Sequence, residues 1–274
     1  MARTFSSAPW RKLGLQGLLV SLLSVILLPV VHADTAAAMA PLAAAAYQLG
    51  SAAPHGFSVV AKSNDQASGF QGVALTDATG RFVVVSFAGT QPSDFNDVLA
   101  DVGIGKGEMG EVEKAVLAAT VTKLPGASQH LESLLGKHNV RTKPLVPNAK
   151  LMAQLAVANR FYDEVASAHK GKSLSITGHS LGGYLAQAVA SRTGVPAVTF
   201  NAPGASAMKK GDAHNITNYI RAHDIVGMFG THIGQVVRYH DVHPNLDPRD
   251  RYVIRNHSIS QFIADFAKGL QAIQ

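Results

Sequence analysis

A serine flanked by glycines is the first feature of the chain with chemical meaning. Residues 178–183 read Gly-His-Ser-Leu-Gly-Gly, after an alternating apolar run at 173–177 and before a helix-forming stretch at 184–190. A strand, a Gly-x-Ser-x-Gly turn and a helix in this order expose the serine hydroxyl, and the glycines let strand and helix approach closely. The helix N-terminus behind Ser180 favours developing negative charge. The pattern predicts that Ser180 is a nucleophile; the alternative is a glycine-rich turn with a solvated serine.

A serine nucleophile needs a base that accepts its proton and an acid that orients the base. Where a sheet carries this turn, the acid and then a histidine follow the serine along the chain. Asp224 follows the strand predicted at 216–222, so it stands at the carboxyl end of a strand, where sheet-borne sites form. We predict it as the acid, in preference to a role as a helix cap or turn residue. The other downstream aspartates are Asp212, Asp241, Asp247, Asp250 and Asp265.

The predicted base is His257, which lies just before an amphipathic C-terminal helix predicted at 259–273. A loop at that position can bring an imidazole over the sheet edge towards Ser180. The remaining downstream candidates are His232, His240 and His243, the last two in a loop rich in Pro and Asp. His179 adjoins the nucleophile but points the wrong way for a base, so we expect it to pack beside the site or to bind backbone.

Two hydrogen-bond donors are required where negative charge develops on the reacting carbonyl oxygen. The N–H of Leu181, one residue after the nucleophile, is the first predicted donor. The second usually comes from the loop after an earlier strand, and residues 87–90, Phe-Ala-Gly-Thr, form that loop here. Thr90 offers both its N–H and its hydroxyl; the alternative is a plain strand-ending turn.

Strands and helices alternate along the chain, which predicts an α/β fold with a mostly parallel central sheet flanked by helices. The segment 81–88 is apolar nearly throughout and is expected to be buried on both faces. The helix at 36–49 is expected to be divided, or to begin, at Pro41. The further strands are predicted at 57–61, 70–75, 173–177, 195–200, 216–222 and 234–240, and a long helix at 148–169.

Residues 1–33 have the features of a signal peptide. Positive residues precede an apolar region at 18–28, and Val31-His32-Ala33 is a small-x-small cleavage site. Cleavage near Ala33 would secrete a single domain, 34–274, to the periplasm or beyond; uncleaved, residues 13–31 are long enough to span a bilayer. The chain has no Cys, so it has no disulfide, and its stability must come from its core.

Charge and metal-ligand patterns exclude two classes of function. The chain has 24 Lys and Arg against 18 Asp and Glu, and removal of Arg3, Arg11 and Lys12 with the leader leaves +3. This is too mild for a nucleic-acid footprint, although it would not oppose an anionic lipid surface. Despite 12 His, no metal-ligand spacing appears beyond the loose His240-Asp241-Val242-His243, so we expect no metal and no cofactor.

Taken together, these residues resemble the fungal-type (class 3) lipase family of α/β-hydrolases, including its bacterial phospholipase A1-like members. The resemblance spans about residues 40–270 and implies an α/β-hydrolase fold that hydrolyses acyl esters of glycerol lipids, at a membrane or lipid-droplet interface. It implies a triad of Ser180, Asp224 and His257, with Thr90 and Leu181 as oxyanion donors. The matching segments are 87–90, 94–101, 177–183, 200–204, 221–226, 231–234 and 256–258.

The sequence departs from the family at residues 103–147, where a glycine-rich loop and two predicted helices stand and a His-x-Gly-Phe segment is missing. Phe95 stands roughly where the family has a Trp. The segment 103–147 is either a lid whose apolar side opens onto lipid or a pair of ordinary packed helices.

The leading hypothesis is a secreted serine carboxylester hydrolase acting on lipid esters, with triacylglycerol as the first substrate class. Phospholipase A1 and a short-chain esterase are the alternatives within the same chemistry. A non-catalytic secreted binding module with this fold is a remote alternative, because every catalytic position is filled. The sequence sets neither the acyl-chain specificity nor the oligomeric state.

Overall fold

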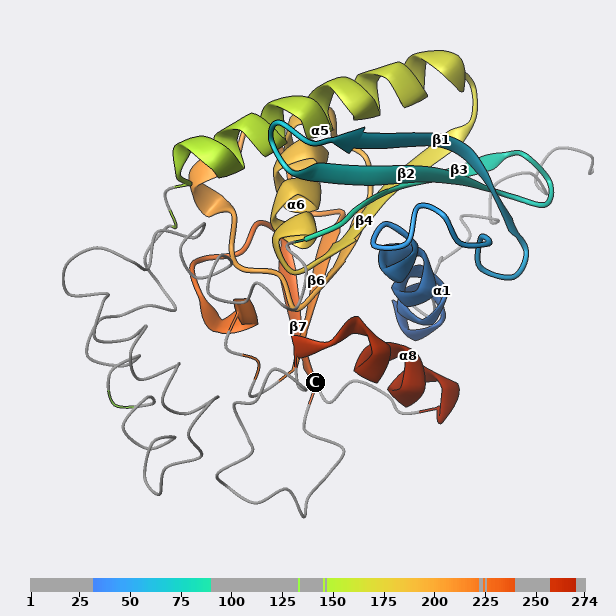
Figure 1. The fold of residues 1–274 in the computed structure, drawn as a ribbon. Coiled ribbons are helices and arrows are strands. Elements are labelled where there is room, and N and C mark those ends of the chain that lie inside the picture. The colour runs from blue at the N-terminus through green and yellow to red at the C-terminus, as the bar shows by residue number, and fades with distance from the viewer. Residues whose placement is uncertain are drawn as a thin grey trace, which may run out of the picture. The chain divides into compact units, whose positions relative to one another are not determined.

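The fold is built on one seven-stranded sheet in the order β1-β2-β3-β4-β5-β6-β7 (Figure 1). The computed structural model describes residues 32–89, 133, 145, 147–221, 224, 226–239 and 257–269. The pairs β1–β2 and β2–β3 are antiparallel and the four later pairs are parallel, so the sheet is mostly parallel, as predicted. The strands are β1 (Phe57–Asp65), β2 (Phe70–Asp77), β3 (Phe82–Phe87), β4 (Ser173–His179), β5 (Ala197–Phe200), β6 (Ile216–Arg221) and β7 (Gln235–Tyr239).

Helices cover both faces of this sheet. α5 (Ala149–Ala168) and α6 (Leu181–Thr193) share one hydrophobic cluster with the sheet, and α1 (His32–Ala45) and α8 (Ile259–Ala267) share a second cluster. β3 divides its side chains between them, because Val83 and Val85 belong to the first cluster and Val84 to the second. Side chains alternate across a strand, so helices on both faces account for the nearly continuous apolar run of β3, which only Ser86 interrupts. Short 3-10 helices η3 (Ser206–Met208) and η4 (Val226–Met228) follow β5 and β6.

The local sequence explains where the helices beside the sheet begin and end. α5 begins after Asn148, whose side chain accepts a hydrogen bond from the Leu151 N–H at 2.8 Å. α6 ends at Gly194, which adopts the left-handed conformation at φ 77°. All residues of α6 from Leu181 to Ser191 are buried, so this helix lies in the interior of the fold.

Two sequence predictions about helices are wrong in detail. α1 runs unbroken from His32 to Ala45 with Pro41 inside it, where a division or a start at Pro41 was expected. Proline costs one backbone hydrogen bond, and burial of Leu42 and Ala43 on the sheet offsets that cost. α8 ends at Ala267, before the predicted end at 273, because Gly269 turns the chain into the left-handed conformation at φ 71°.

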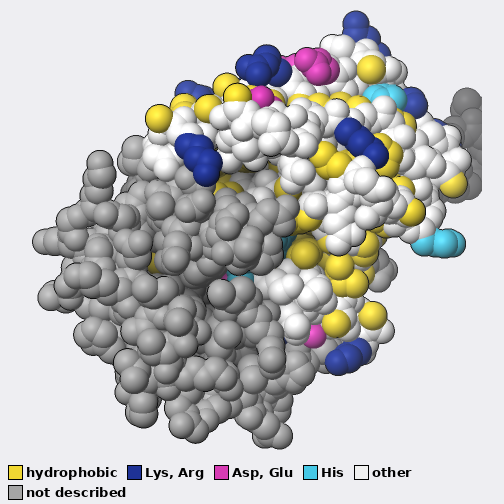
Figure 2. Space-filling model, in the orientation of Figure 1, with side chains coloured by type: hydrophobic (Ala, Val, Ile, Leu, Met, Phe, Trp, Pro, Cys, Tyr) yellow, Lys and Arg dark blue, Asp and Glu magenta, His cyan; other side chains and the backbone are white. Residues whose placement is uncertain are grey.

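The remaining sequence predictions fall partly outside the described part of the chain. Residues 33–274 form one compact unit, and Leu13–Val31, Phe95, Thr90 and most of 103–147 lie outside the described residues. None of the described helices combines the length and the apolar character that a membrane crossing needs. On the face shown in Figure 2, the charged side chains of the described residues are scattered over the surface.

Shortening a side chain at the centre of the first cluster should destabilise the fold. Leu185 on α6 is 1% exposed, and we expect Leu185→Ala to lower the free energy of unfolding by about 3 kcal/mol. Met152 on α5 is 44% exposed, so Met152→Ala should change it by less than about 0.5 kcal/mol. Urea unfolding of both variants measures the difference, and equal losses would contradict this account of the core.

Candidate active site

Ser180 occupies a strained turn between the end of β4 and the start of α6. Its φ of 59° and ψ of −134° lie in a region that residues with side chains rarely adopt. Surrounding hydrogen bonds hold it there: the Ser180 N–H donates to Phe200 O at 3.0 Å, and Ser180 O accepts from the Gly183 N–H at 2.9 Å. The residue is 1% exposed, and among the described residues its Oγ contacts no hydrogen-bond partner. The structure therefore has the sharp strand–turn–helix that the sequence predicts around Ser180.

Two glycines allow backbone to pack directly on this turn. A Cβ at Gly182 would lie 2.1 Å from the Phe87 carbonyl oxygen, so the first turn of α6 touches the end of β3. A Cβ at Gly89 would lie 2.9 Å from both Ser180 Cβ and the Leu181 nitrogen. The segment after β3 therefore reaches Ser180 itself, and no larger residue fits at Gly182 or Gly89 without a shift of the backbone.

The predicted oxyanion donors are placed only in part. As the first residue of α6, Leu181 has an N–H that no carbonyl of its own helix can accept, and this N–H lies beside Gly89. Thr90 follows Gly89 in the chain but lies outside the described residues. The described structure thus brings the end of β3 beside Ser180 and the Leu181 N–H, and the second predicted donor, at Thr90, stays a prediction.

Asp224 and His257 form a buried pair. His257 Nδ1 lies 2.8 Å from Asp224 Oδ1, and the two residues are 8% and 1% exposed. The other Asp224 oxygen accepts the Gly227 N–H at 2.6 Å, which fixes the carboxylate at the end of β6. His257 is the residue before Ser258, the N-cap of α8. A carboxylate on Nδ1 leaves the Nε2 position of the imidazole for proton exchange with a substrate or nucleophile.

The other described candidates are engaged elsewhere. His232 Nε2 bonds to the Ala202 carbonyl oxygen at 2.8 Å. Asp212 pairs with His214 at the surface, where the side chains are 73% and 79% exposed. Asp265 pairs with Arg221. His240, His243, Asp241, Asp247 and Asp250 lie outside the described residues.

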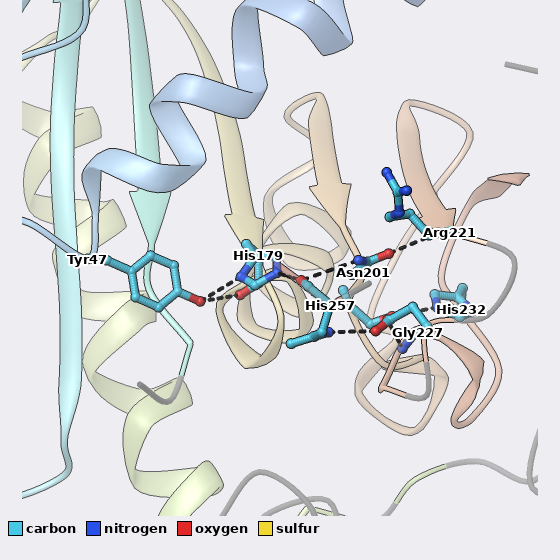
Figure 3. Close-up of polar contacts among 9 residues, drawn as sticks. Tyr47, His179, Asn201, Arg221, Gly227, His232 and His257 are labelled. Carbon is cyan, nitrogen blue, oxygen red and sulfur yellow. Dashed lines mark hydrogen bonds and ion pairs between the residues drawn. The ribbon is translucent and has the colours of Figure 1, made fainter. Parts of the chain in front are cut away.

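A chain of hydrogen bonds joins the His257 backbone to the turn at Ser180 (Figure 3). The His257 carbonyl oxygen lies 2.5 Å from His179 Nε2 and 3.3 Å from Asn201 Nδ2. The His179 ring stacks at a tilt on the His257 ring, with 4.7 Å between centroids. Since His179 directly precedes Ser180, these contacts place His257 against the turn. His179 binds backbone beside the site, as expected from its position next to the nucleophile.

Tyr47 completes this chain, and no pattern in the sequence pointed to it. Its hydroxyl oxygen lies 2.9 Å from His179 Nδ1 and accepts the Gly89 N–H at 3.0 Å. Asn201 was also missed as a site residue, although it follows β5 within a segment that resembles the family. It adopts a left-handed φ of 45°, and its Oδ1 accepts the Arg221 N–H at 2.9 Å. Both residues act through contacts between segments far apart in the sequence.

Burial sets the charge state of the two groups beside the turn. Removal from water, together with the neighbouring His257, lowers the pKa of His179 well below its usual value, so the imidazole is neutral near pH 7. Burial raises the pKa of the Tyr47 hydroxyl above its usual value, so it keeps its proton. In the described part of the chain no three His, Asp or Glu side chains are grouped as a metal site.

A buried ion pair anchors α8, and with it His257, to β6. Arg221 at the end of β6 is completely buried and pairs with Asp265 of α8, itself 4% exposed. The guanidinium carbon of Arg221 also lies over the Phe262 ring, 5.9 Å from the ring centroid. The strand that leads to Asp224 and the helix that follows His257 are thereby joined by charge as well as by packing.

Comparison with known proteins adds three findings. Residues 151–232 match the family model of a Tle-like phospholipase domain. A 43-residue stretch is 56% identical to ATG15 of Eremothecium gossypii, a protein whose name describes a candidate lipase. The matched stretch covers 16% of this chain and 8% of that protein. The chain also superposes on the Rhizomucor miehei lipase propeptide complex, a deletion mutant, with a TM-score of 0.50, 12% identity and coverage of 82% and 77% of the two chains.

The resemblance to the fungal-type lipase family is confirmed. The Rhizomucor structure shows the α/β-hydrolase fold, and lipase II of Rhizopus niveus is also similar, with a TM-score of 0.48, 14% identity and coverage of 75% and 80%. The matched segment 151–232 contains Ser180 and Asp224 but neither Thr90 nor His257. The chain spans less than a tenth of the length of the curated fungal relative, so the likeness to ATG15 is local.

Breaking the buried ion pair should cost far more stability than breaking an exposed one. We expect Arg221→Met to lower the free energy of unfolding by about 3–5 kcal/mol, because it leaves the Asp265 carboxylate buried and uncompensated. Arg192 pairs with Asp163 at 2.7 Å on the surface, and Arg192→Met should cost about 1 kcal/mol or less. Urea unfolding at one ionic strength compares the variants; similar losses would refute the anchoring role.

Proposed function

We propose that the protein is a serine hydrolase of carboxylic esters in lipids. The observation that carries the proposal is the buried Asp224–His257 pair held against the strained turn of Ser180. A strained, buried serine beside an imidazole with a carboxylate on its Nδ1 is the arrangement that acyl transfer requires. The triad of Ser180, Asp224 and His257 and the oxyanion donors Leu181 and Thr90 belong to this proposal.

The proposed reaction proceeds through an acyl-enzyme. Ser180 Oγ attacks the ester carbonyl carbon, its proton moves to His257 Nε2, and the carbonyl oxygen becomes an oxyanion that Leu181 N–H and Thr90 stabilise. Asp224 accepts a hydrogen bond from Nδ1–H of His257 and stabilises the imidazolium. The C–O bond to the alcohol then breaks, and the alcohol leaves with the proton from His257. His257 then takes a proton from a water molecule, which attacks the acyl carbon. The bond from that carbon to Ser180 Oγ breaks, His257 returns the proton to Oγ, and the fatty acid leaves.

Lipid esters are the proposed substrate class, at a membrane or lipid-droplet interface. Support comes from the resemblance to the fungal-type lipase family and from the phospholipase model that matches residues 151–232. The match to a phospholipase model makes phospholipids the alternative substrate class to triacylglycerol. Assays on emulsified triglyceride, on phosphatidylglycerol vesicles and on short soluble esters separate a lipase, a phospholipase A1 and an esterase.

Removal of the Ser180 hydroxyl should abolish turnover. We expect Ser180→Ala to lower kcat on p-nitrophenyl esters by a factor of about a thousand or more, with an unchanged unfolding midpoint. Ser58 is exposed on β1, and Ser58→Ala should leave kcat unchanged. A fluorophosphonate probe should label the wild type and Ser58→Ala but not Ser180→Ala. The activity of the wild type should also survive EDTA. Turnover by Ser180→Ala would refute the proposed nucleophile.

We also propose that the mature enzyme is secreted as residues 34–274. The leader-like pattern of 1–33 supports this, since it combines positive charge, an apolar region and a small-x-small site. The intact mass of protein from the culture medium or periplasm should correspond to cleavage near Ala33. A mass that includes residues 1–33 on a membrane-bound protein would contradict cleavage.

A further inference from the structure

Tyr47 and His179 connect three parts of the site that the proposed reaction needs at once (Figure 3). The Tyr47 hydroxyl accepts the N–H of Gly89, in the segment that leads to the second oxyanion donor. It contacts His179 in the nucleophile turn, both at Nδ1 and, at 3.2 Å, at the backbone carbonyl. His179 Nε2 in turn contacts the carbonyl oxygen of His257. Segments from residues 47, 89, 179 and 257 are therefore joined by one chain of hydrogen bonds.

The direction of each hydrogen bond follows from the groups involved. The His257 carbonyl can only accept, so His179 Nε2 must carry the hydrogen. The Tyr47 oxygen accepts the Gly89 N–H, and its single proton faces two acceptors on His179, the Nδ1 position at 2.9 Å and, farther away, the carbonyl oxygen at 3.2 Å. Burial lowers the pKa of His179 well below its usual value and so disfavours a second proton on the ring; with Nε2 protonated, Nδ1 is then bare and accepts the Tyr47 O–H at 2.9 Å.

A neutral His179 also suits the charge that the proposed reaction creates. Proton transfer from Ser180 makes His257 an imidazolium, and its ring lies 4.7 Å from the ring of His179. A second positive charge at that distance in a buried site would oppose this step. The titratable groups that face His179 in the described structure are Tyr47 and His257, with Asp224 on the far side of His257.

We propose that Tyr47 and His179 are positioning residues. They fix the segment at Gly89, the turn at Ser180 and the His257 backbone relative to one another, and His179 does so as the neutral Nε2–H tautomer. This inference rests on the proposed function. Neither residue touches the reacting atoms; they act through the placement of Ser180, Gly89 and His257. Misplacement of a catalytic group by about 1 Å can lower the rate about a hundredfold, so loss of this chain of hydrogen bonds is expected to lower kcat.

The first experiment compares two tyrosine variants. Tyr47→Phe removes the hydroxyl that joins Gly89 to His179, and we expect kcat to fall about tenfold or more while KM changes little. Tyr239→Phe is the matched control, because the buried Tyr239 hydroxyl has no hydrogen-bond partner among the described residues. It should keep wild-type kcat. Equal kcat in the two variants would overturn the positioning role of Tyr47.

The second experiment separates the Nε2–H donor from the bulk of the His179 ring. His179→Gln can place an amide N–H near the His257 carbonyl, whereas His179→Phe keeps a ring of similar size without a donor. We expect the glutamine variant to retain about tenfold more kcat than the phenylalanine variant, at similar unfolding midpoints. Equal kcat values would show that the donor is not needed.

The third experiment observes the tautomer directly and does not depend on activity. Long-range proton–nitrogen NMR spectra of histidine-labelled protein, assigned with His179→Gln, should show a protonated Nε2 and a bare Nδ1 near pH 7. In Tyr47→Phe the bond that favours the neutral form is lost, so His179 should take up its proton at a higher pH than in wild type.

The outcomes of the proposed function and of this inference are distinguishable. A hydrogen on Nδ1 in wild type, or an unchanged His179 titration in Tyr47→Phe, would overturn the inference even in an active esterase. A protein that hydrolyses no ester would refute the proposed function, while the NMR signals would still decide the tautomer of His179.

Discussion

The close contact between the first turn of α6 and the end of β3 is the constraint on which the rest of the site depends. Gly182 lies so near the Phe87 carbonyl that a single Cβ would overlap it. This contact forces the chain through the sharp turn at Ser180, whose φ and ψ cost free energy of about 1–3 kcal/mol. The buried sheet and the fully buried α6 maintain that strain, because relaxing the turn would open packed interior.

Once that turn is set, the other groups reach it through contacts between distant segments. Asp224 comes from the end of β6, His257 precedes α8, and the two meet at 2.8 Å although 33 residues separate them in the chain. The Arg221–Asp265 ion pair joins β6, which precedes Asp224, to α8, which follows His257. Desolvated polar groups are costly unless they are paired, and in this site each pairing also orients a neighbour.

The sequence predicted the fold class and the mostly parallel sheet well, since elements such as β3 and α6 have strong local patterns. It was less accurate where packing outweighs local preference. Pro41 does not divide α1, because neighbouring residues are buried on the sheet, and α8 is shorter than its amphipathic pattern because Gly269 ends it. Tyr47 and Asn201 could not be predicted as site residues, because a tyrosine or asparagine in a loop gives no signal until its partner is known.

By itself the sequence determined the sharp turn at Ser180, since Gly-His-Ser-Leu-Gly between a strand and a helix is a local pattern whose glycines let the two elements pack closely. It also named Asp224 and His257 as candidates from chain order. Only the tertiary structure decided that these two side chains meet, that Arg221 is paired with Asp265, and that His179 bonds to the His257 backbone. Those contacts join segments tens of residues apart, and their geometry depends on how helices pack on both faces of the sheet, which no short stretch of sequence specifies.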